Sequence, residues 1–222
     1  MPVPIAHIAF PELSLHPSAG HKLRGYFGNF FREHSPLLHN HLDDGSLRYR
    51  YPLVQYKVID KVPCLVGLGE GADLLAGLFI KVRELKLDDQ VIPVHTKNIE
   101  SRQWQPEVGQ DLHTYSFKTL WMALNQQNYR EYLQEDESRK QEHLKRILIG
   151  NILSFLKGMD IYLDPGQRLL AQLSVHPSKT RFKDQPMFAF SGRFTTNILL
   201  PDYIGLGKSV SRGYGVIERL PL

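Results

Sequence analysis

Apolar residues in the first half of the chain recur at spacings that predict both helices and strands. Leu23, Phe27 and Phe30 are three or four residues apart, which places them on one side of a helix from about residue 16 to 34. From residue 48 to 59 apolar and polar residues alternate, as in a strand with two different faces. The remaining elements predicted here are strands at 3–10, 63–68 and 81–87 and a helix at 72–79. The resulting order, strand, helix, strand, strand, helix, strand, is the ferredoxin-like pattern.

The second half of the chain shows a similar mixture of elements. Leu144, Leu148 and Ile152 form the apolar stripe of a helix at 137–156. The other elements predicted in this half are a helix at 120–133 and strands at 114–118, 168–175, 186–200 and 214–219. The second half therefore also combines helix with antiparallel strands.

The mostly polar residues 98–111 predict the junction between the two halves. We therefore expect two domains, 1–106 and 107–222. The chain has 222 residues, enough for two domains of about 100 residues each. The predicted fold class is α+β, with two tandem ferredoxin-like (RRM-like) folds, antiparallel sheets and a glycine-rich loop near the C-terminus.

Composition and charge say more about the partners and the cellular location of the protein than about the reaction it performs. The formal net charge of +4 and the pI of about 9.1 mildly favour a polyanionic partner, although many ordinary enzymes are as basic. The single cysteine, Cys64, lies in an apolar run, which predicts a buried inert thiol, excludes an internal disulfide and suggests a reducing cytoplasm. The longest nearly apolar run, 147–156, is shorter than the about 20 residues that span a bilayer, so we expect no membrane segment.

Four glycines near the C-terminus form the most specific motif of the chain. They make two Gly-x-Gly pairs, Gly205/Gly207 and Gly213/Gly215, on either side of five residues. Glycine permits positive φ and close backbone approach, and exposed N–H groups in such a loop form an anion-binding concavity. The residues of this loop that we expect to bind RNA are Gly205, Gly207, Lys208, Ser209, Ser211, Arg212, Gly213 and Gly215.

The same loop has a simpler interpretation as a tight turn into the last strand. Lys208 and Arg212 favour the RNA-binding interpretation because they add positive charge for phosphates, and Ser209 and Ser211 add hydroxyl donors. A nucleotide-binding loop fits less well, because neither the P-loop spacing nor the dinucleotide-binding spacing is present.

Three segments together resemble a known family. The two glycine–apolar–glycine pairs around a basic centre resemble the terminal motif of the RAMP superfamily. Residues 190–194, 197–203 and 51–57 resemble the CRISPR-associated repeat-processing endoribonucleases in particular. The resemblance implies two ferredoxin-like folds, binding of a CRISPR repeat RNA and one metal-independent cut per repeat. It also suggests homodimerisation and membership of a CRISPR effector complex.

His39 and His41 are the candidate catalytic residues. An unperturbed pKa of about 6.5 lets histidine accept or donate a proton near neutral pH, and two histidines two residues apart project the same way from an extended segment. RNA carries its own nucleophile, the 2′-hydroxyl, so cleavage needs a base, an acid for the departing 5′-oxygen and positive charge near the phosphate. In the resembled family the catalytic histidine also follows the first helix. We expect His41 to be the general acid and His39 its base or positioning partner, or the reverse.

Other residues near the histidine pair complete this hypothesis or compete with it. Tyr49 or Tyr51 would orient the phosphate or the 2′-hydroxyl, and Lys57 lies on the same strand face. The segment has two alternative interpretations: an ordinary polar loop, or a metal site, because Asp43 and Asp44 are competent ligands beside the histidines. The catalytic pair is the favoured interpretation, so we expect no metal and no cofactor.

Basic and aromatic residues outside these two motifs are less specific. Lys22 and Arg24 on the first helix are candidates for RNA contact, although a solvated helix face explains them equally well. His143 belongs to a basic stripe opposite the apolar stripe of the long helix, which is typical of a solvated face. Trp104 and Trp121 are predicted to be core or interface residues.

These observations together predict a cytoplasmic endoribonuclease that makes CRISPR RNAs by acid–base transesterification. The products would carry a 2′,3′-cyclic phosphate and a 5′-hydroxyl. The alternative is a non-catalytic RNA-binding subunit of a CRISPR effector complex with the same folds. The histidine pair favours the enzyme.

Overall fold

The computed structural model of the chain describes residues 2–30, 51–182 and 185–221. Contacts among these residues divide the chain into two units, which are Met1–Gln105 with Ser211–Gly213, and Pro106–Val210 with Tyr214–Leu222. No helix in the described ranges is both long and apolar enough to cross a membrane.

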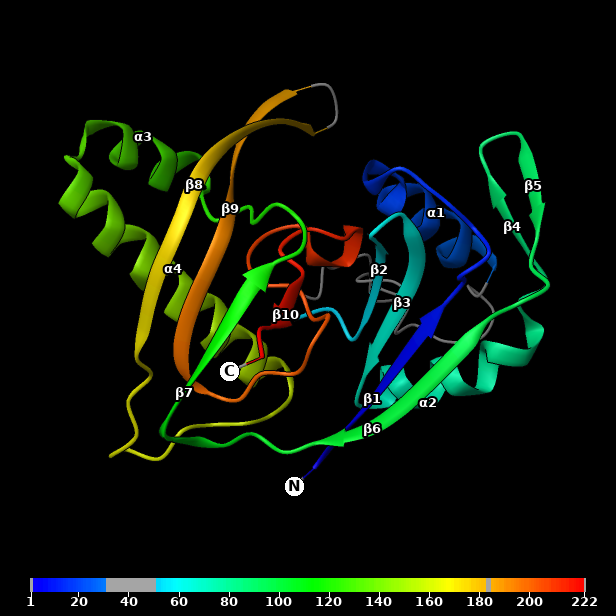
Figure 1. The fold of residues 1–222 in the computed structure, drawn as a ribbon, viewed down its shortest axis with the longest axis horizontal. Helices are drawn as coiled ribbons and strands as arrows, with labels where there is room; N and C mark the ends of the chain where they lie inside the picture. The colour runs from blue at the N-terminus through cyan, green and yellow to red at the C-terminus, as the bar shows by residue number, and fades with distance from the viewer. Residues whose placement is uncertain (1, 31–50, 183–184, 222) are drawn as a thin grey trace, which may run out of the picture. The chain divides into compact units, whose positions relative to one another are not determined.

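The first unit contains a four-stranded antiparallel sheet with the strand order β2-β3-β1-β6 (Figure 1). Its strands are β1 (Val3–Ala9), β2 (Val54–Ile59), β3 (Val62–Leu68) and β6 (Asn98–Trp104). Its helices are α1 (Gly20–Phe30) and α2 (Glu70–Leu78), with the short 3₁₀ turns η1 (Pro17–Ala19) and η3 (Phe79–Lys81). The order β1-α1-β2-β3-α2-β6 and the strand neighbours make this a ferredoxin-like fold, as predicted.

Helices α1 and α2 pack on one face of this sheet. Leu23 and Phe27 from α1 and Leu75 from α2 share a buried cluster with Ile8 and Tyr56 of the sheet. The Phe27 ring stacks on the Tyr56 ring, with centroids 5.9 Å apart. Leu23 and Phe27, two residues of the apolar stripe that predicts the first helix, are therefore buried against the sheet.

The opposite face of β2 and β3 is buried as well. Gln55 and Lys57 of β2 are fully buried, and Cys64 and Val66, which lie opposite them on β3, are buried too. Cys64 is a free, buried cysteine, so the predicted burial of its thiol is confirmed, and this burial raises its pKa to about 12. The alternation along β2 therefore separates an apolar face from a more polar one, and both faces are inside the protein.

The fourth strand of the first sheet differs from the predicted one. Residues 84–87 (β4, Glu84–Leu87) pair with β5 (Gln90–Pro93) in a separate two-stranded hairpin, so the expected sheet strand at 81–87 is wrong. The fourth sheet strand is β6, inside the region predicted as the junction. It is an edge strand exposed at every position except Trp104, so it lacks the apolar alternation that marks a strand in a sequence.

The second unit contains another four-stranded antiparallel sheet, with the order β10-β7-β9-β8 (Figure 1). Its strands are β7 (Val108–Phe117), β8 (Ala171–Phe182), β9 (Gln185–Ile198) and β10 (Ile217–Arg219), and its helices are α3 (Gln126–Gln134) and α4 (Glu137–Gly158). The stripe predicted on the long helix, Leu144, Leu148 and Ile152, is buried. Strand for strand, the sheet order matches that of the first unit, which confirms the second ferredoxin-like fold.

The connection between β9 and β10 occupies the position of the second helix in a ferredoxin-like fold. In the first unit α2 follows the third strand, but residues 199–216 of the second unit contain only the 3₁₀ turn η4 (Val210–Arg212). The glycine-rich loop at 205–215 lies in this connection. The loop thus replaces a helix between two strands of the sheet.

Helix α3 begins later than the predicted helix at 120–133. The backbone of Trp121 pairs with Phe190 in both directions, with N···O distances of 2.8 and 2.9 Å, which keeps this residue out of the helix. The helix starts only after Asn125, whose side chain accepts a hydrogen bond from the Asn128 N–H at 2.7 Å.

Candidate nucleic-acid interface

The glycine-rich loop is closed by backbone hydrogen bonds at both of its ends. The Leu206 N–H donates to the Gly215 carbonyl at 2.8 Å, which joins one Gly-x-Gly pair to the other. Lys208 N–H donates to the Met122 carbonyl at 3.0 Å, and Gly215 N–H donates to the Leu120 carbonyl at 2.9 Å. These N–H groups are used inside the protein and are not available to an anion.

Close packing explains why glycine occupies these positions. A Cβ atom on Gly215 would lie 1.9 Å from the Leu206 carbonyl oxygen, and one on Gly205 would lie 2.6 Å from the Cβ of Val210. A Cβ atom on Gly207 would lie 2.8 Å from both the Met122 carbonyl oxygen and the Trp121 indole nitrogen. The tight-turn interpretation therefore accounts for these three glycines, and the basic and hydroxyl side chains that are predicted to bind RNA lie between the pairs.

The residues between the glycine pairs are the accessible part of the loop. Lys208 is exposed, and Ser209, Ser211 and Arg212 are partly exposed. Partial burial lowers the pKa of the Lys208 amine. Ser209 has a φ of 56°, a left-handed conformation that is uncommon outside glycine. The structure thus keeps the basic and hydroxyl side chains of the predicted site accessible on a tightly packed backbone.

The tip of the loop, Ser211–Gly213, belongs to the first unit. A Cβ atom on Gly213 would lie 3.2 Å from the Tyr56 carbonyl oxygen and 3.3 Å from the Lys57 Cα, and one on Gly20 would lie 2.4 Å from the Arg212 carbonyl oxygen. Arg212 and Gly213 are therefore adjacent to the beginning of α1 and to β2. The sequence alone gives no signal for the part played by Gly20, because it is an isolated glycine at the start of a helix.

Lys57 in the first unit has surroundings that are unusual for a basic side chain. Its side chain is fully buried, and among the described residues its amine has no hydrogen-bond partner. Burial lowers its pKa to about 7, and the nearby Cys64 opposes this shift only in part. An amine with such a pKa exchanges its proton near neutral pH, which is a property of lysines that act as bases.

Of the other predicted catalytic residues, only Tyr51 lies in the part of the chain that the structure describes. His39, His41 and Tyr49 lie outside the described residues, as do Asp43 and Asp44 of the alternative metal site. Tyr51 is described and is partly buried. Among the residues that the structure does describe, no group of three or more His, Cys, Asp or Glu side chains is arranged to hold a metal ion.

The two basic residues predicted on α1 have different surroundings. The Lys22 amine forms an ion pair with Asp88 at the turn of the β4–β5 hairpin, and both side chains are substantially exposed. Arg24 is partly buried and is close enough to Tyr56 to act on its pKa, which burial raises strongly. Arg24 is therefore close to β2, the strand that the loop tip contacts.

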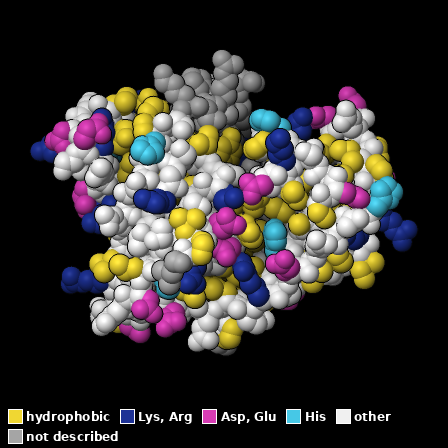
Figure 2. All heavy atoms as spheres, in the orientation of Figure 1, with side chains coloured by type: hydrophobic (Ala, Val, Ile, Leu, Met, Phe, Trp, Pro, Cys, Tyr) yellow, Lys and Arg dark blue, Asp and Glu magenta, His cyan; other side chains and the backbone are white. Residues whose placement is uncertain are grey.

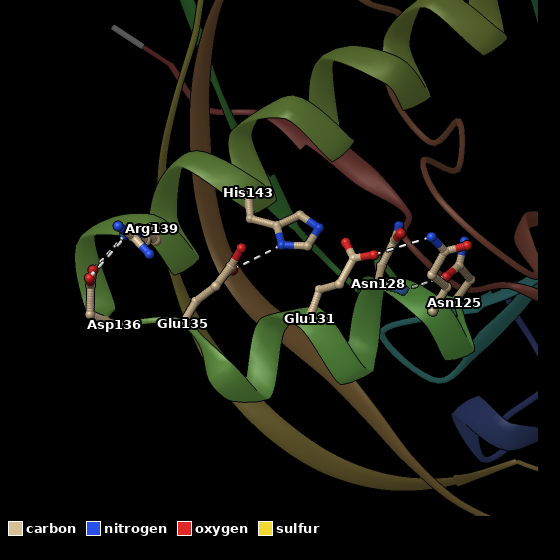
Figure 3. Close-up of polar contacts among 8 residues, drawn as sticks. Asn125, Asn128, Glu131, Glu135, Asp136, Arg139 and His143 are labelled. Carbon is tan, nitrogen blue, oxygen red and sulfur yellow. Dashed lines mark hydrogen bonds and ion pairs between the residues drawn. The ribbon is translucent and has the colours of Figure 1, made fainter.

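A second polar cluster lies where α3 meets α4, and it corrects one prediction. Figure 3 shows His143 on α4 pointing toward Glu135, whose carboxylate is 2.9 Å from the imidazole Nδ1. His143 is only 6% exposed, so its assignment to a solvated face is wrong. Its partner lies in the bend that follows α3, so the contact comes from the helix–helix turn, which the helical spacing of α4 does not reveal.

Two family models match this chain, one over each half. The Cas6b N-terminal domain matches residues 1–105, and the Cas6b C-terminal domain matches residues 107–220. The chain belongs to the Cas6b family. A crystal structure of Cas6b is 34% identical, covers 99% of this chain and 100% of its own, and has a TM-score of 0.93.

Two further proteins are also similar to this Cas6b chain. A crystal structure described as the CRISPR RNA processing endoribonuclease Cas6b is 31% identical, covers 99% of this chain and 100% of its own, and has a TM-score of 0.79. An uncharacterized protein of Methanocaldococcus jannaschii is 33% identical over 144 residues, which are 64% of this chain and 97% of that protein. The resemblance drawn from the sequence is therefore confirmed.

The segment before the loop, which carries part of the resemblance, holds the second unit of this Cas6b protein together. Phe190 and Phe194 are buried, and Asn197 accepts a hydrogen bond from the Leu170 N–H at 2.8 Å. The Leu200 N–H donates to the hydroxyl of Tyr115 at 2.7 Å. These contacts fix the chain just before it enters the loop.

Proposed function

We propose that this protein is an endoribonuclease that cleaves CRISPR repeat transcripts into mature CRISPR RNAs. The observation that carries the proposal is that both Cas6b domains are present, in a chain that aligns over 99% of its length with a CRISPR RNA processing endoribonuclease at 31% identity. The accessible Lys208 and Arg212, held between two tightly packed glycine pairs, support a phosphate backbone as the ligand.

The proposed reaction is a metal-independent transesterification. The 2′-oxygen attacks the adjacent phosphorus as the P–O5′ bond breaks, leaving a 2′,3′-cyclic phosphate and a 5′-hydroxyl. His39 takes the proton of the 2′-hydroxyl and His41 gives a proton to the departing 5′-oxygen, or the two exchange roles. Because the nucleophile belongs to the RNA, one base and one acid suffice for the proton transfers.

Other residues of the proposed site bind and orient the RNA. Lys208 and Arg212 would neutralise phosphates while Ser209 and Ser211 donate hydrogen bonds to their oxygens. Arg24 would add positive charge near β2. Tyr49 or Tyr51 would orient the scissile phosphate or the 2′-hydroxyl.

Lys57 has an indirect part in this proposal and does not contact the RNA. Its amine is fully buried and lies on the strand that the loop tip contacts. We assign it a positioning role, in which its protonation state adjusts the electrostatic potential of the site.

The test is cleavage of a cognate repeat RNA by the full chain in excess chelator. We expect one cut per repeat with cyclic-phosphate ends, and a loss of about 100-fold or more in the cleavage rate when His39→Ala and His41→Ala are combined. The matched control is His95→Ala, which changes an exposed histidine on another segment and should leave the rate unchanged. Tight binding without any product would instead identify a non-catalytic RNA-binding subunit, and loss of cleavage in chelator would reject the metal-independent mechanism.

We extend the proposal to the assembly of the protein in the cytoplasm. The enzyme would form a homodimer and pass its product to a CRISPR effector complex. The mass of the protein in solution, measured with and without repeat RNA, tests the first part: a monomer in both conditions would contradict it. Co-purification of the tagged protein with the effector subunits tests the second.

A further inference from the structure

Asn151 is a polar residue in the most apolar stretch of the chain, residues 147–156 on α4. Its side-chain oxygen accepts a hydrogen bond from the indole N–H of Trp121 at 3.0 Å. Trp121 is fully buried, and a buried N–H group needs a partner inside the protein. Asn151 therefore supplies the hydrogen-bond acceptor that the buried indole N–H of Trp121 requires.

The Trp121 ring is also fixed by its other neighbours. The Phe117 ring stacks on it, with centroids 5.2 Å apart and planes only 6° apart. Its backbone pairs with Phe190 in both directions, at 2.8 and 2.9 Å. A ring held at its face, at its N–H and through its backbone has little freedom to turn.

The fixed indole supports the first half of the glycine-rich loop. Gly207 approaches it so closely that a Cβ atom there would lie 2.8 Å from the indole nitrogen. The next residue, Lys208, donates its backbone N–H to the carbonyl of Met122, the neighbour of Trp121, at 3.0 Å. The backbone that carries the exposed Lys208 side chain is thus seated directly on Trp121 and Met122.

We propose that Asn151 and Trp121 are positioning residues, which hold the Lys208 amine where it meets an RNA phosphate. The inference rests on the proposed function, because it takes Lys208 as a phosphate contact. Asn151 and Trp121 do not touch the RNA. They restrict the loop before binding, so that less conformational entropy is lost when Lys208 engages the phosphate.

The test compares binding of a CRISPR repeat RNA by the wild type, Asn151→Leu, Lys208→Met and the double variant. Leucine has the same number and branching of side-chain heavy atoms as asparagine but lacks the hydrogen-bond acceptor. We expect affinity to fall about threefold to tenfold in each single variant. The double variant should lose no more than Lys208→Met alone, because both changes act through the same contact. The slope of log K against log salt should fall by about 0.7 when the Lys208 contact is lost.

A merely structural role for Asn151 gives a different pattern. It would lower the Tm, and its effect on RNA affinity would add to that of Lys208→Met. Trp104→Phe provides the matched control, because it changes the other buried tryptophan, which lies on β6, and should affect the Tm but not the RNA affinity. Trp121→Phe, which keeps the ring stacking and removes the N–H, replaces Asn151→Leu if that variant does not fold.

The outcomes separate this inference from the proposed function. If the wild type binds repeat RNA but Asn151→Leu binds equally well, or if its loss adds to that of Lys208→Met, the inference is wrong and the proposed function stands. An unchanged affinity in Lys208→Met also overturns the inference. A wild type that binds no repeat RNA overturns the proposed function itself, and the inference with it.

Discussion

At the scale of single residues, Lys57 combines two properties that rarely occur together. Its amine is fully buried, and among the described residues it has no hydrogen-bond partner. Removing an amine from water disfavours its charged form, so such a residue costs stability. A protein that keeps this lysine gives up stability for it, which is typical of functional sites.

Lys57→Met tests this cost through its dependence on pH. Burial lowers the pKa of Lys57 to about 7 in the folded protein, whereas lysine in an unfolded chain titrates near 10.4. Between these values the unfolded chain binds a proton that the folded protein does not, so this lysine makes the free energy of unfolding rise with pH, by about 1.4 kcal/mol per pH unit. We expect Lys57→Met to be more stable than the wild type at pH near 7, by a margin that shrinks as the pH rises.

Urea unfolding of both proteins between about pH 7 and pH 9 measures this margin. Lys86→Met is the control, because Lys86 is well exposed and its removal should leave the pH dependence parallel to that of the wild type. A margin that does not change with pH would show that the amine is not strongly perturbed. If Lys57 also positions groups for cleavage, the more stable variant should cleave repeat RNA more slowly.

The sequence predicts the accessible residues of the loop better than the reason for its glycines. Lys208 and Arg212 lie between the glycine pairs and are accessible, as a basic loop should be. The glycine spacing predicts exposed N–H groups, but Gly207 and Gly215 allow close packing against Trp121 and Leu206 instead. These contacts join distant parts of the chain, and local composition carries no information about them.

At the scale of elements, the glycine-rich loop behaves as a packed structural element. Gly215→Ala would place a methyl group 1.9 Å from the Leu206 carbonyl oxygen, at a position where φ is also positive, at 64°. Backbone atoms cannot move aside as a flexible side chain can, so we expect a loss of about 2–4 kcal/mol in the free energy of unfolding. RNA affinity should fall as well, because the frame that carries Lys208 is distorted.

Gly150→Ala is the matched control for this loop variant. Gly150 lies inside the long helix α4, and a Cβ atom there would meet no other atom within 4 Å. Alanine is the better helix former by about 1 kcal/mol, so this variant should be more stable than the wild type. Thermal unfolding distinguishes the two variants directly, and a Gly215→Ala protein as stable as the wild type would refute the packing role of the loop.

The predicted elements succeed where burial imposes a pattern on the sequence and fail where it does not. Strands β1 and β3 and helices α1 and α4 are recognised because their apolar residues repeat at the right spacing. Strand β6 is missed because nearly all of it is exposed. The β4–β5 hairpin is misplaced because its apolar alternation looks the same whether the strand joins the sheet or pairs locally.

At the scale of the whole molecule, positive and negative charges nearly balance. The net charge is only +4, and Figure 2 shows basic and acidic side chains interspersed on the face that it presents. RNA binding by such a protein must depend on a few well-placed cations more than on a broad positive field. The dependence of affinity on salt counts these cations, because each phosphate contact on single-stranded RNA contributes about 0.7 to the slope of log K against log salt.

The salt slope should change by different amounts when basic residues on α1 and in the loop are replaced. Lys208→Gln should lower the salt slope by about 0.7, because the Lys208 side chain is exposed in the loop. Lys22→Gln should lower it less, because the Lys22 amine is paired with Asp88 and must leave this partner to reach a phosphate. Asp88→Asn frees the lysine and should raise RNA affinity in the wild type but not in Lys22→Gln. Equal slopes for Lys22→Gln and Lys208→Gln would mean that the ion pair does not hold Lys22 back, and that α1 and the loop contribute equally to RNA binding.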